Sequence, residues 1–182
     1  MTNISPQQFK DAFLQVVIKC QQDLIDRWGA RKDYTHFMRG TILPEVGPLL
    51  GIEVFSGDYY YLDCIYYTAK DTEHFGNPKT TYATSIGIAL EHENDIGSTA
   101  IEMNKLQLFN APLKVLVTYS QNESERTFHL ERYNKILRAG DIFGDFATLR
   151  RHLVIFGSLH EPVVNWHFYV YESSGFKGLP AT

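Results

Sequence analysis

The sequence predicts a single α/β domain with a mixed central β-sheet flanked by helices. Segments with the apolar spacing of helices alternate along the chain with β-branched segments typical of strands, and 182 residues suit one domain. Hydrophobic residues make up 44% of the chain, enough for a core. Charged residues make up only 21%, which argues against a disordered protein.

The first expected element is an amphipathic helix over residues 6–28. Ser5 can cap this helix, Pro6 suits its first position and Gln8 completes a capping box. Apolar residues then recur at helical spacing, and Gly29 ends the helix.

The later strands and helices indicate the type of sheet. Strands are expected at 52–55, 59–68, 80–93, 112–119, 153–157 and 163–171. Helices are expected at 99–109 and after the capping residue Asn122, with shorter ones from Pro44 and over 141–149. Three consecutive strands followed by a helical crossover into a fourth, continuously apolar strand indicate a mixed sheet.

The domain organisation follows from these elements. Residues 1–182 are expected to form one domain, in which the N-terminal helix precedes a core at about 41–172. Residues 56–58 are expected to form a hairpin turn and residues 70–79 a loop. Residues 173–182 are expected to form a loose tail.

Charge narrows the classes of function. The formal net charge is −4, which argues against a broad electrostatic surface for nucleic acid, although a local basic patch can coexist with an acidic total. The nearest approach to a basic cluster is Lys135, Arg138, Arg150 and Arg151, which we interpret as solvated surface.

The two cysteines indicate a reducing compartment. Cys20 and Cys64 form neither a disulfide framework nor a metal motif, and both are expected to be buried thiols. The N-terminus has no signal-peptide pattern, and the chain has no run of about 18 apolar residues. The expected location is therefore the cytoplasm, without membrane contact.

Carboxylates lie within two of the expected strands. Asp63 interrupts the strand at 59–68, and Glu91 and Glu93 end the strand at 80–93. A carboxylate within an apolar strand is costly unless it is paired, hydrogen-bonded or bound to a metal, so the carboxylates of the two strands are expected to converge. Converging carboxylates suit Mg²⁺, which prefers oxygen ligands.

Strand parity divides the residues around Glu91. Glu91 and Glu93 point to the same face, about 7 Å apart by strand rise, and that face is otherwise lined by small residues. His92 points to the opposite face and is interpreted as a packed histidine. The competing interpretation of the two glutamates is a strand end with surface ion pairs.

Tyrosines gather in the segment that carries Asp63, at positions 59, 60, 61, 66 and 67. Such side chains can stack on nucleic-acid bases. Tyrosines on a half-buried strand more often pack the core and its rim, which is the favoured interpretation. A tyrosine-lined apolar pocket for a small ligand is a further, weaker hypothesis.

The order of elements resembles that of the PD-(D/E)XK nuclease superfamily, the restriction-endonuclease-like fold. The resemblance covers about residues 41–140. It rests on the meander with Asp63, the strand end Leu90-Glu91-His92-Glu93, and a helix containing Lys105 that leads into the strand 113–119.

The resemblance implies a function and a role for each residue. It implies Mg²⁺- or Mn²⁺-dependent hydrolysis of phosphodiester bonds in DNA or RNA, and a homodimer. Asp63 and Glu91 would be metal ligands, with Glu45 as an additional acid from the first core helix. Glu93 would occupy the family's lysine position, and Lys105 is the candidate for a lysine moved to the next helix.

Two departures from the family pattern leave a second function open. No proline precedes Asp63, and Glu93 stands where the family usually has lysine. These departures and the acidic net charge favour the alternative of a non-catalytic interaction protein that retains a nuclease-like fold.

Overall fold

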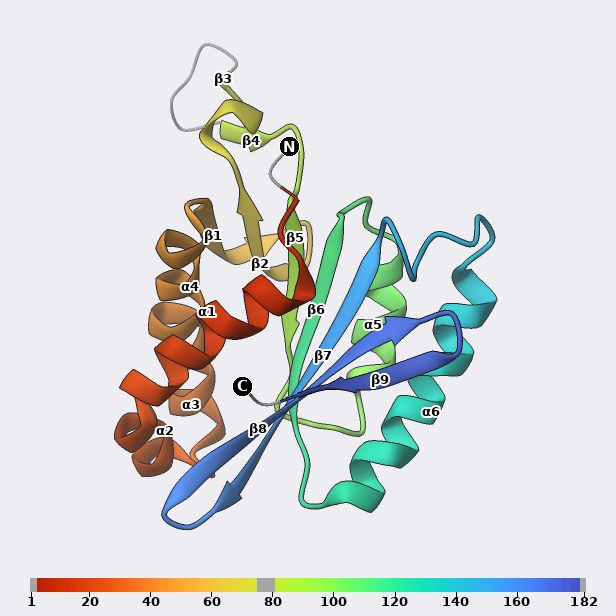
Figure 1. Ribbon diagram of the computed structural model, residues 1–182. Helices are drawn as coiled ribbons and strands as arrows, with labels where there is room; N and C mark the ends of the chain where they lie inside the picture. Colours follow the sequence, from red (N-terminus) through yellow and green to blue (C-terminus); the bar gives the residue numbers. More distant parts are fainter. Residues whose placement is uncertain (1–2, 75–80, 181–182) are drawn as a thin grey trace.

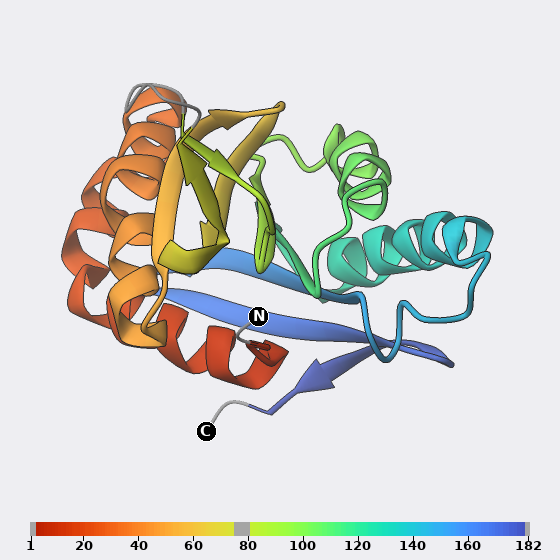
Figure 2. The ribbon, with the colours of Figure 1, turned by 90° about the horizontal axis from the view of Figure 1, so that it is seen from above.

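The computed structural model describes residues 3–74 and 81–180. A seven-stranded mixed sheet with the order β1-β2-β5-β6-β7-β8-β9 forms its centre. Helices α1 to α4 cover one face, and α5 and α6 cover the other (Figures 1 and 2). The predicted α/β class and mixed sheet are therefore confirmed. No helix within the described ranges is long and apolar enough to cross a membrane.

The helices and strands have the following bounds. The first face carries α1 (Pro6–Lys19), α2 (Gln21–Arg27), α3 (Arg31–Phe37), the π-helical turn η1 (Met38–Ile42) and α4 (Leu43–Leu50). The sheet consists of β1 (Glu53–Tyr59), β2 (Leu62–Tyr67), β5 (Ile88–His92), β6 (Leu113–Tyr119), β7 (Arg151–His160), β8 (Val163–Glu172) and β9 (Gly175–Leu179). The other face carries α5 (Thr99–Gln107) and α6 (Glu123–Gly140), and a separate ladder pairs β3 (Thr72–His74) with β4 (Thr81–Ala83).

The topology places a meander beside a parallel crossover. Strands β1, β2 and β5 pair antiparallel in sequence order. Helix α5 then leads from β5 into β6, which pairs parallel with β5, and β7 continues the parallel run. Strand β6 is central and buried on both faces, as its apolar sequence predicts.

The N-terminal region is more helical than the sequence predicts. Cys20 separates α1 from α2, so the expected helix over 6–28 is two helices. The next residues, for which the sequence shows no obvious pattern, form α3 and η1. Their buried side chains Tyr34, Met38 and Ile42 are spaced by four residues, and the many polar residues between them obscured this period.

The predicted hairpin turn lies too early in the chain. Residues 56–58 continue β1, and the turn is at Tyr60 and Tyr61, whose φ angles are 50° and 69°. Asp58 accepts a hydrogen bond from the Tyr61 backbone N–H at 2.8 Å and so closes the turn. Gly57 and Asp58 resemble a turn in the sequence, but the ladder pairing extends β1 to Tyr59.

Three further boundaries differ from the prediction. The expected strand 80–93 is divided into β4 and β5, while residues 75–80, part of the expected loop and strand, lie outside the described residues. Residues 141–149 form turns around Asp141 and Asp145 rather than a helix. The expected loose tail contains β9, which pairs with β8.

The α6 N-terminus shows the predicted cap. The Asn122 side chain accepts a hydrogen bond from the Glu125 backbone N–H at 2.9 Å. Replacement of Asn122 by alanine is expected to lower the free energy of unfolding by about 1 kcal/mol, because one N–H at the helix start loses its partner. Urea unfolding would measure this, with Ser124→Ala as the control. An equal loss in both variants would contradict the capping role.

A lysine lies inside the core on β6. Lys114 has no exposed surface, and its Nζ lies 4.9 Å from the centre of the Phe146 ring without a hydrogen-bond partner among the described residues. Its ladder neighbour His152 is also buried. Burial, and next the Arg150 charge, lower the pKa of Lys114 from 10.5 to about 8, although Asp145 and Asp141 oppose this.

Candidate metal and catalytic site

The meander brings Asp63 and Glu91 together. The antiparallel ladder between β2 and β5 pairs Cys64 with Leu90, so Asp63 and Glu91 occupy the next opposite positions. Side chains directly opposite one another in a sheet point to the same face. Here that face is the one covered by α5 and α6, because neighbours of the same parity, such as Ala89, pack in that core.

Glu91 is a buried carboxyl group. The residue is only 2% exposed. Burial raises the pKa of Glu91 from 4.5 to about 9, the Lys105 ammonium opposes this rise, and the Asp63 and Glu102 carboxylates add to it. A carboxylate in this position needs a nearby cation in order to stay ionised at neutral pH.

Lys105 provides such a cation from α5. Its Nζ lies 2.8 Å from Glu91 Oε1 and 2.5 Å from Glu102 Oε2, and it donates a hydrogen bond to the Tyr61 carbonyl at 2.9 Å. Burial lowers the pKa of Lys105, but Glu102 and Glu91 together outweigh this, so the net shift is upward from 10.5. Lys105 is therefore held as an ammonium ion at the meander.

Glu102 joins the site as a second ionic partner of Lys105. The two residues are three positions apart on α5, so they share one side of the helix. That spacing was visible in the sequence. Contact of this side with β5 was not, because it depends on how α5 lies across the sheet.

Asp63 is held by groups from two elements. Arg39 of η1 places its guanidinium 3.0 Å from Asp63 Oδ1. The His92 backbone N–H donates to Asp63 Oδ2 at 3.0 Å. Nothing in the sequence pointed to Arg39, because it lies in a segment for which the sequence indicated no regular structure.

His92 lies away from the carboxylates, as strand parity predicts. Its ring is buried on the α1–α3 side, with Nε2 2.7 Å from the Tyr119 hydroxyl. Burial lowers the pKa of His92 from 6.5 to about 3, with a smaller contribution from the Arg39 charge. The ring is therefore neutral and packed.

Two predicted site residues are not brought into the cluster. Glu93 lies just beyond β5, where its carboxylate accepts a hydrogen bond from the Asp95 backbone N–H at 2.7 Å. Glu45 pairs with Lys19 of α1 at 2.9 Å, because α4 directs it toward that helix. The expectation of a third ligand from Glu45 is therefore corrected, and Lys105 rather than Glu93 contacts Glu91.

The residues present fit a hard cation bound mainly by water. Across residues 3–74 and 81–180, no group of three or more His, Cys, Asp or Glu side chains is placed to hold a metal ion. Mg²⁺ retains several waters and needs only one or two protein carboxylates together with substrate phosphate oxygens. Glu91 Oε1 is in contact with the Lys105 ammonium at 2.8 Å, so a metal ion would share this carboxylate with Lys105.

Comparison with known proteins adds no relative. No protein-family model matches the chain, and no curated protein matches it. The proposal for its function therefore depends on the topology and on the contacts of Asp63, Glu91 and Lys105.

Proposed function

We propose that the protein is a Mg²⁺-dependent nuclease that hydrolyses phosphodiester bonds of DNA or RNA. Asp63 and Glu91 hold the metal ion, and Lys105 acts beside the phosphate. The observation that carries the proposal is the convergence of these three side chains where a β-meander leads through α5 into a parallel strand. The resemblance to the PD-(D/E)XK superfamily implies a metal site at Asp63 and Glu91 with Lys105 nearby, although Glu45 and Glu93, which it also implied, lie outside this cluster.

The side chains have complementary tasks in this proposal. A bound Mg²⁺ supplies charge neutralisation at the phosphate and a more acidic water. Arg39 and the His92 N–H fix the orientation of Asp63, while Glu102 holds Lys105 in place. The Lys105 ammonium stabilises the negative charge that develops on the phosphate during attack.

One observation favours the alternative of a non-catalytic interaction protein. Asp63 and Glu91 each already have a cationic partner, Arg39 and Lys105 respectively, so both carboxylates are compensated without a metal. A degenerate site of this kind would keep the fold and bind a partner without cleaving it.

A cleavage assay separates the two functions. Labelled single-stranded DNA, duplex DNA and RNA would be incubated with the protein in Mg²⁺, in Mn²⁺ and in EDTA. The nuclease proposal predicts metal-dependent cleavage of at least one substrate and none in EDTA. Absence of cleavage for all three substrates with both metals would favour the non-catalytic alternative.

Replacement of Lys105 by methionine is expected to separate metal binding from catalysis. Cleavage should fall about 100-fold or more, because a charged group at the phosphate is lost. Mn²⁺ affinity should be retained or increase, because an ammonium 2.8 Å from Glu91 is removed. Lys135→Met, at an exposed position of α6, is the control. Unchanged cleavage in Lys105→Met would refute the catalytic role.

Two finer expectations belong to this proposal. Cys20 and Cys64 are free and buried, which is consistent with the cytoplasm, where we place the protein. The homodimer implied by the resemblance stays a prediction. Sedimentation equilibrium would test it, with a mass of twice 20.9 kDa expected for the dimer.

A further inference from the structure

A basic groove lies beside the candidate site. It has a volume of about 740 Å³ and is formed by α3, η1 and β1. Its lining includes Arg31, Lys32, His36 and Arg39, together with Ser56 and Gly57 of β1. Among the residues that the structure describes, no carboxylate lines this groove, although the net charge of the chain is −4.

Two cations of the groove are available to a ligand, whereas Arg39 is paired with Asp63. Arg31 and Lys32 are exposed, and within the described part of the chain neither forms an ion pair with a carboxylate. Asp33, the acidic residue of α3, lines a neighbouring cavity instead of this groove. Helix α3 therefore directs its carboxylate away from the groove, while its cations face β1.

Arg39 connects the groove to the candidate site. Its side chain lines the groove and also contacts Asp63 Oδ1 at 3.0 Å. A polyanion that occupied the groove would therefore reach Arg39, whose guanidinium links the groove to Asp63. A row of exposed cations leading to a pair of carboxylates suits a chain of phosphates, since the cations neutralise the backbone on either side of the reacting group.

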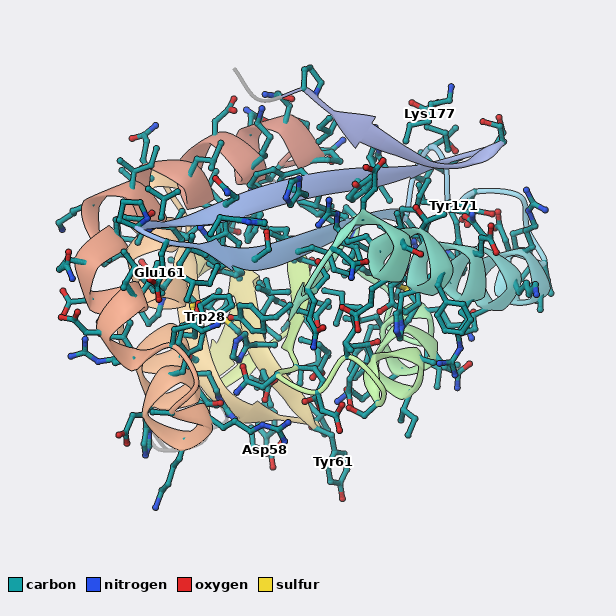
Figure 3. The ribbon with its side chains drawn as sticks, turned by 90° about the horizontal axis from the view of Figure 1, so that it is seen from below. Trp28, Asp58, Tyr61, Glu161, Tyr171 and Lys177 are labelled. Atoms are coloured by element: carbon teal, nitrogen blue, oxygen red, sulfur yellow. The ribbon has the colours of Figure 1, made fainter. Side chains whose placement is uncertain are left out.

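The tip of the hairpin adds two exposed aromatic rings. Tyr60 is 63% exposed and Tyr61 is 80% exposed. The Tyr61 side chain projects away from the molecule near Asp58 (Figure 3). The Tyr61 carbonyl accepts the hydrogen bond from Lys105, which fixes the tip beside the candidate site.

The backbone at this tip disfavours tyrosine. Both residues have positive φ, which costs a non-glycine residue about 1–2 kcal/mol, and two-residue hairpin turns of this kind favour Asn-Gly. Two bulky, exposed rings at these positions reduce stability without filling the core. Their side chains are consistent with a role in binding, where aromatic rings serve as stacking surfaces for unpaired bases.

We propose that the groove binds the phosphate backbone of a single-stranded nucleic acid while Tyr60 and Tyr61 stack on its bases. Arg31, Lys32 and Arg39 contact successive phosphates and guide the strand toward Asp63 and Glu91. A single strand is the substrate class because bases within a duplex do not expose their faces to a side-chain ring. This inference rests on the proposed nuclease function and specifies its substrate.

Fluorescence anisotropy in EDTA tests binding without cleavage. The probes are a fluorescein-labelled 20-mer of thymidine and a labelled 20-base-pair duplex. The wild-type protein is expected to bind the single strand more tightly. Lys32→Glu should weaken that binding about ten-fold at low salt. Arg31→Ser should reduce the slope of log K against log salt concentration by about 0.7, because one phosphate contact is lost. Lys135→Glu makes the same charge change as Lys32→Glu on α6 and should have little effect.

The double variant Tyr60→Asn/Tyr61→Gly tests the hairpin tip separately. It should weaken oligonucleotide binding about ten-fold while raising the midpoint of thermal unfolding, because Asn-Gly suits the turn. A gain in stability excludes misfolding as the cause of weaker binding.

The outcomes distinguish this inference from the nuclease proposal. Binding that depends on Lys32 and the two tyrosines, without cleavage in Mg²⁺, would support the groove and refute the nuclease. Cleavage in Mg²⁺ together with unaltered binding in the groove variants would support the nuclease and refute the groove. Undetectable binding by the wild-type protein, equal affinity for the duplex, or an equal loss in Lys135→Glu would overturn the inference.

Discussion

Replacement of Glu91 by glutamine is expected to abolish metal-dependent cleavage while leaving the fold intact. The amide removes the negative charge of a metal ligand, which we expect to reduce the cleavage rate at least about 1000-fold. Burial raises the pKa of Glu91 to about 9 and so favours the protonated carboxyl group, which glutamine resembles. Lys105 loses one ionic partner in this variant but keeps Glu102, so the free energy of unfolding should change little.

Glu93→Gln is the matched control for this experiment. Glu93 lies two residues further along the chain, but its carboxylate accepts a backbone hydrogen bond from Asp95 instead of facing Lys105. Its replacement should leave the cleavage rate within a few-fold of wild type. If Glu93→Gln lost activity and Glu91→Gln retained it, the assignment of the metal ligand would be wrong.

Replacement of Lys114 by methionine is expected to stabilise the protein by about 2 kcal/mol at neutral pH. The lowering of the lysine pKa from 10.5 to about 8 corresponds to an upper limit of about 3 kcal/mol, at about 1.4 kcal/mol per pKa unit. Methionine has a similar length and needs no hydrogen bond in this core. The midpoint of thermal unfolding should rise by about 4–8 °C.

The pH dependence provides a second test of Lys114. Its pKa is lower in the folded protein than in the unfolded chain, so the unfolded chain binds the extra proton between pH 8 and 10.5. The advantage of methionine should therefore be complete below pH 8 and disappear as the pH rises to 10.5. Lys135→Met should show neither effect. A loss of stability in Lys114→Met would mean that the buried ammonium has a compensating partner.

The strands of the fold were predicted well where apolar pattern and burial agree. Strand β6 is apolar apart from Lys114 and Thr118 and is buried on both faces, as expected. The turn between β1 and β2 was misplaced because Gly57 and Asp58 have turn chemistry, whereas the ladder places the turn at two tyrosines. Local preference is overruled there by pairing across the sheet.

The sequence predicted part of the candidate site. It predicted which side chains of one strand share a face, but not the contacts between residues of different elements. Strand parity correctly directed His92 away from Glu91. The contacts of Arg39 with Asp63 and of Lys105 with Glu91 join residues that are far apart in the sequence, so no local pattern could reveal them. Glu45 was assigned by resemblance alone, and the packing of α4 against α1 pairs it with Lys19 instead.

Mn²⁺ binding measured by calorimetry tests the central claim most directly. The titration would compare the wild-type protein with Asp63→Asn and with Glu45→Gln, which changes a carboxylate outside the site. The account predicts binding by the wild-type protein and by Glu45→Gln, and loss of binding in Asp63→Asn. Absence of binding by the wild-type protein, or binding that survives in Asp63→Asn, would contradict a metal site at the meander.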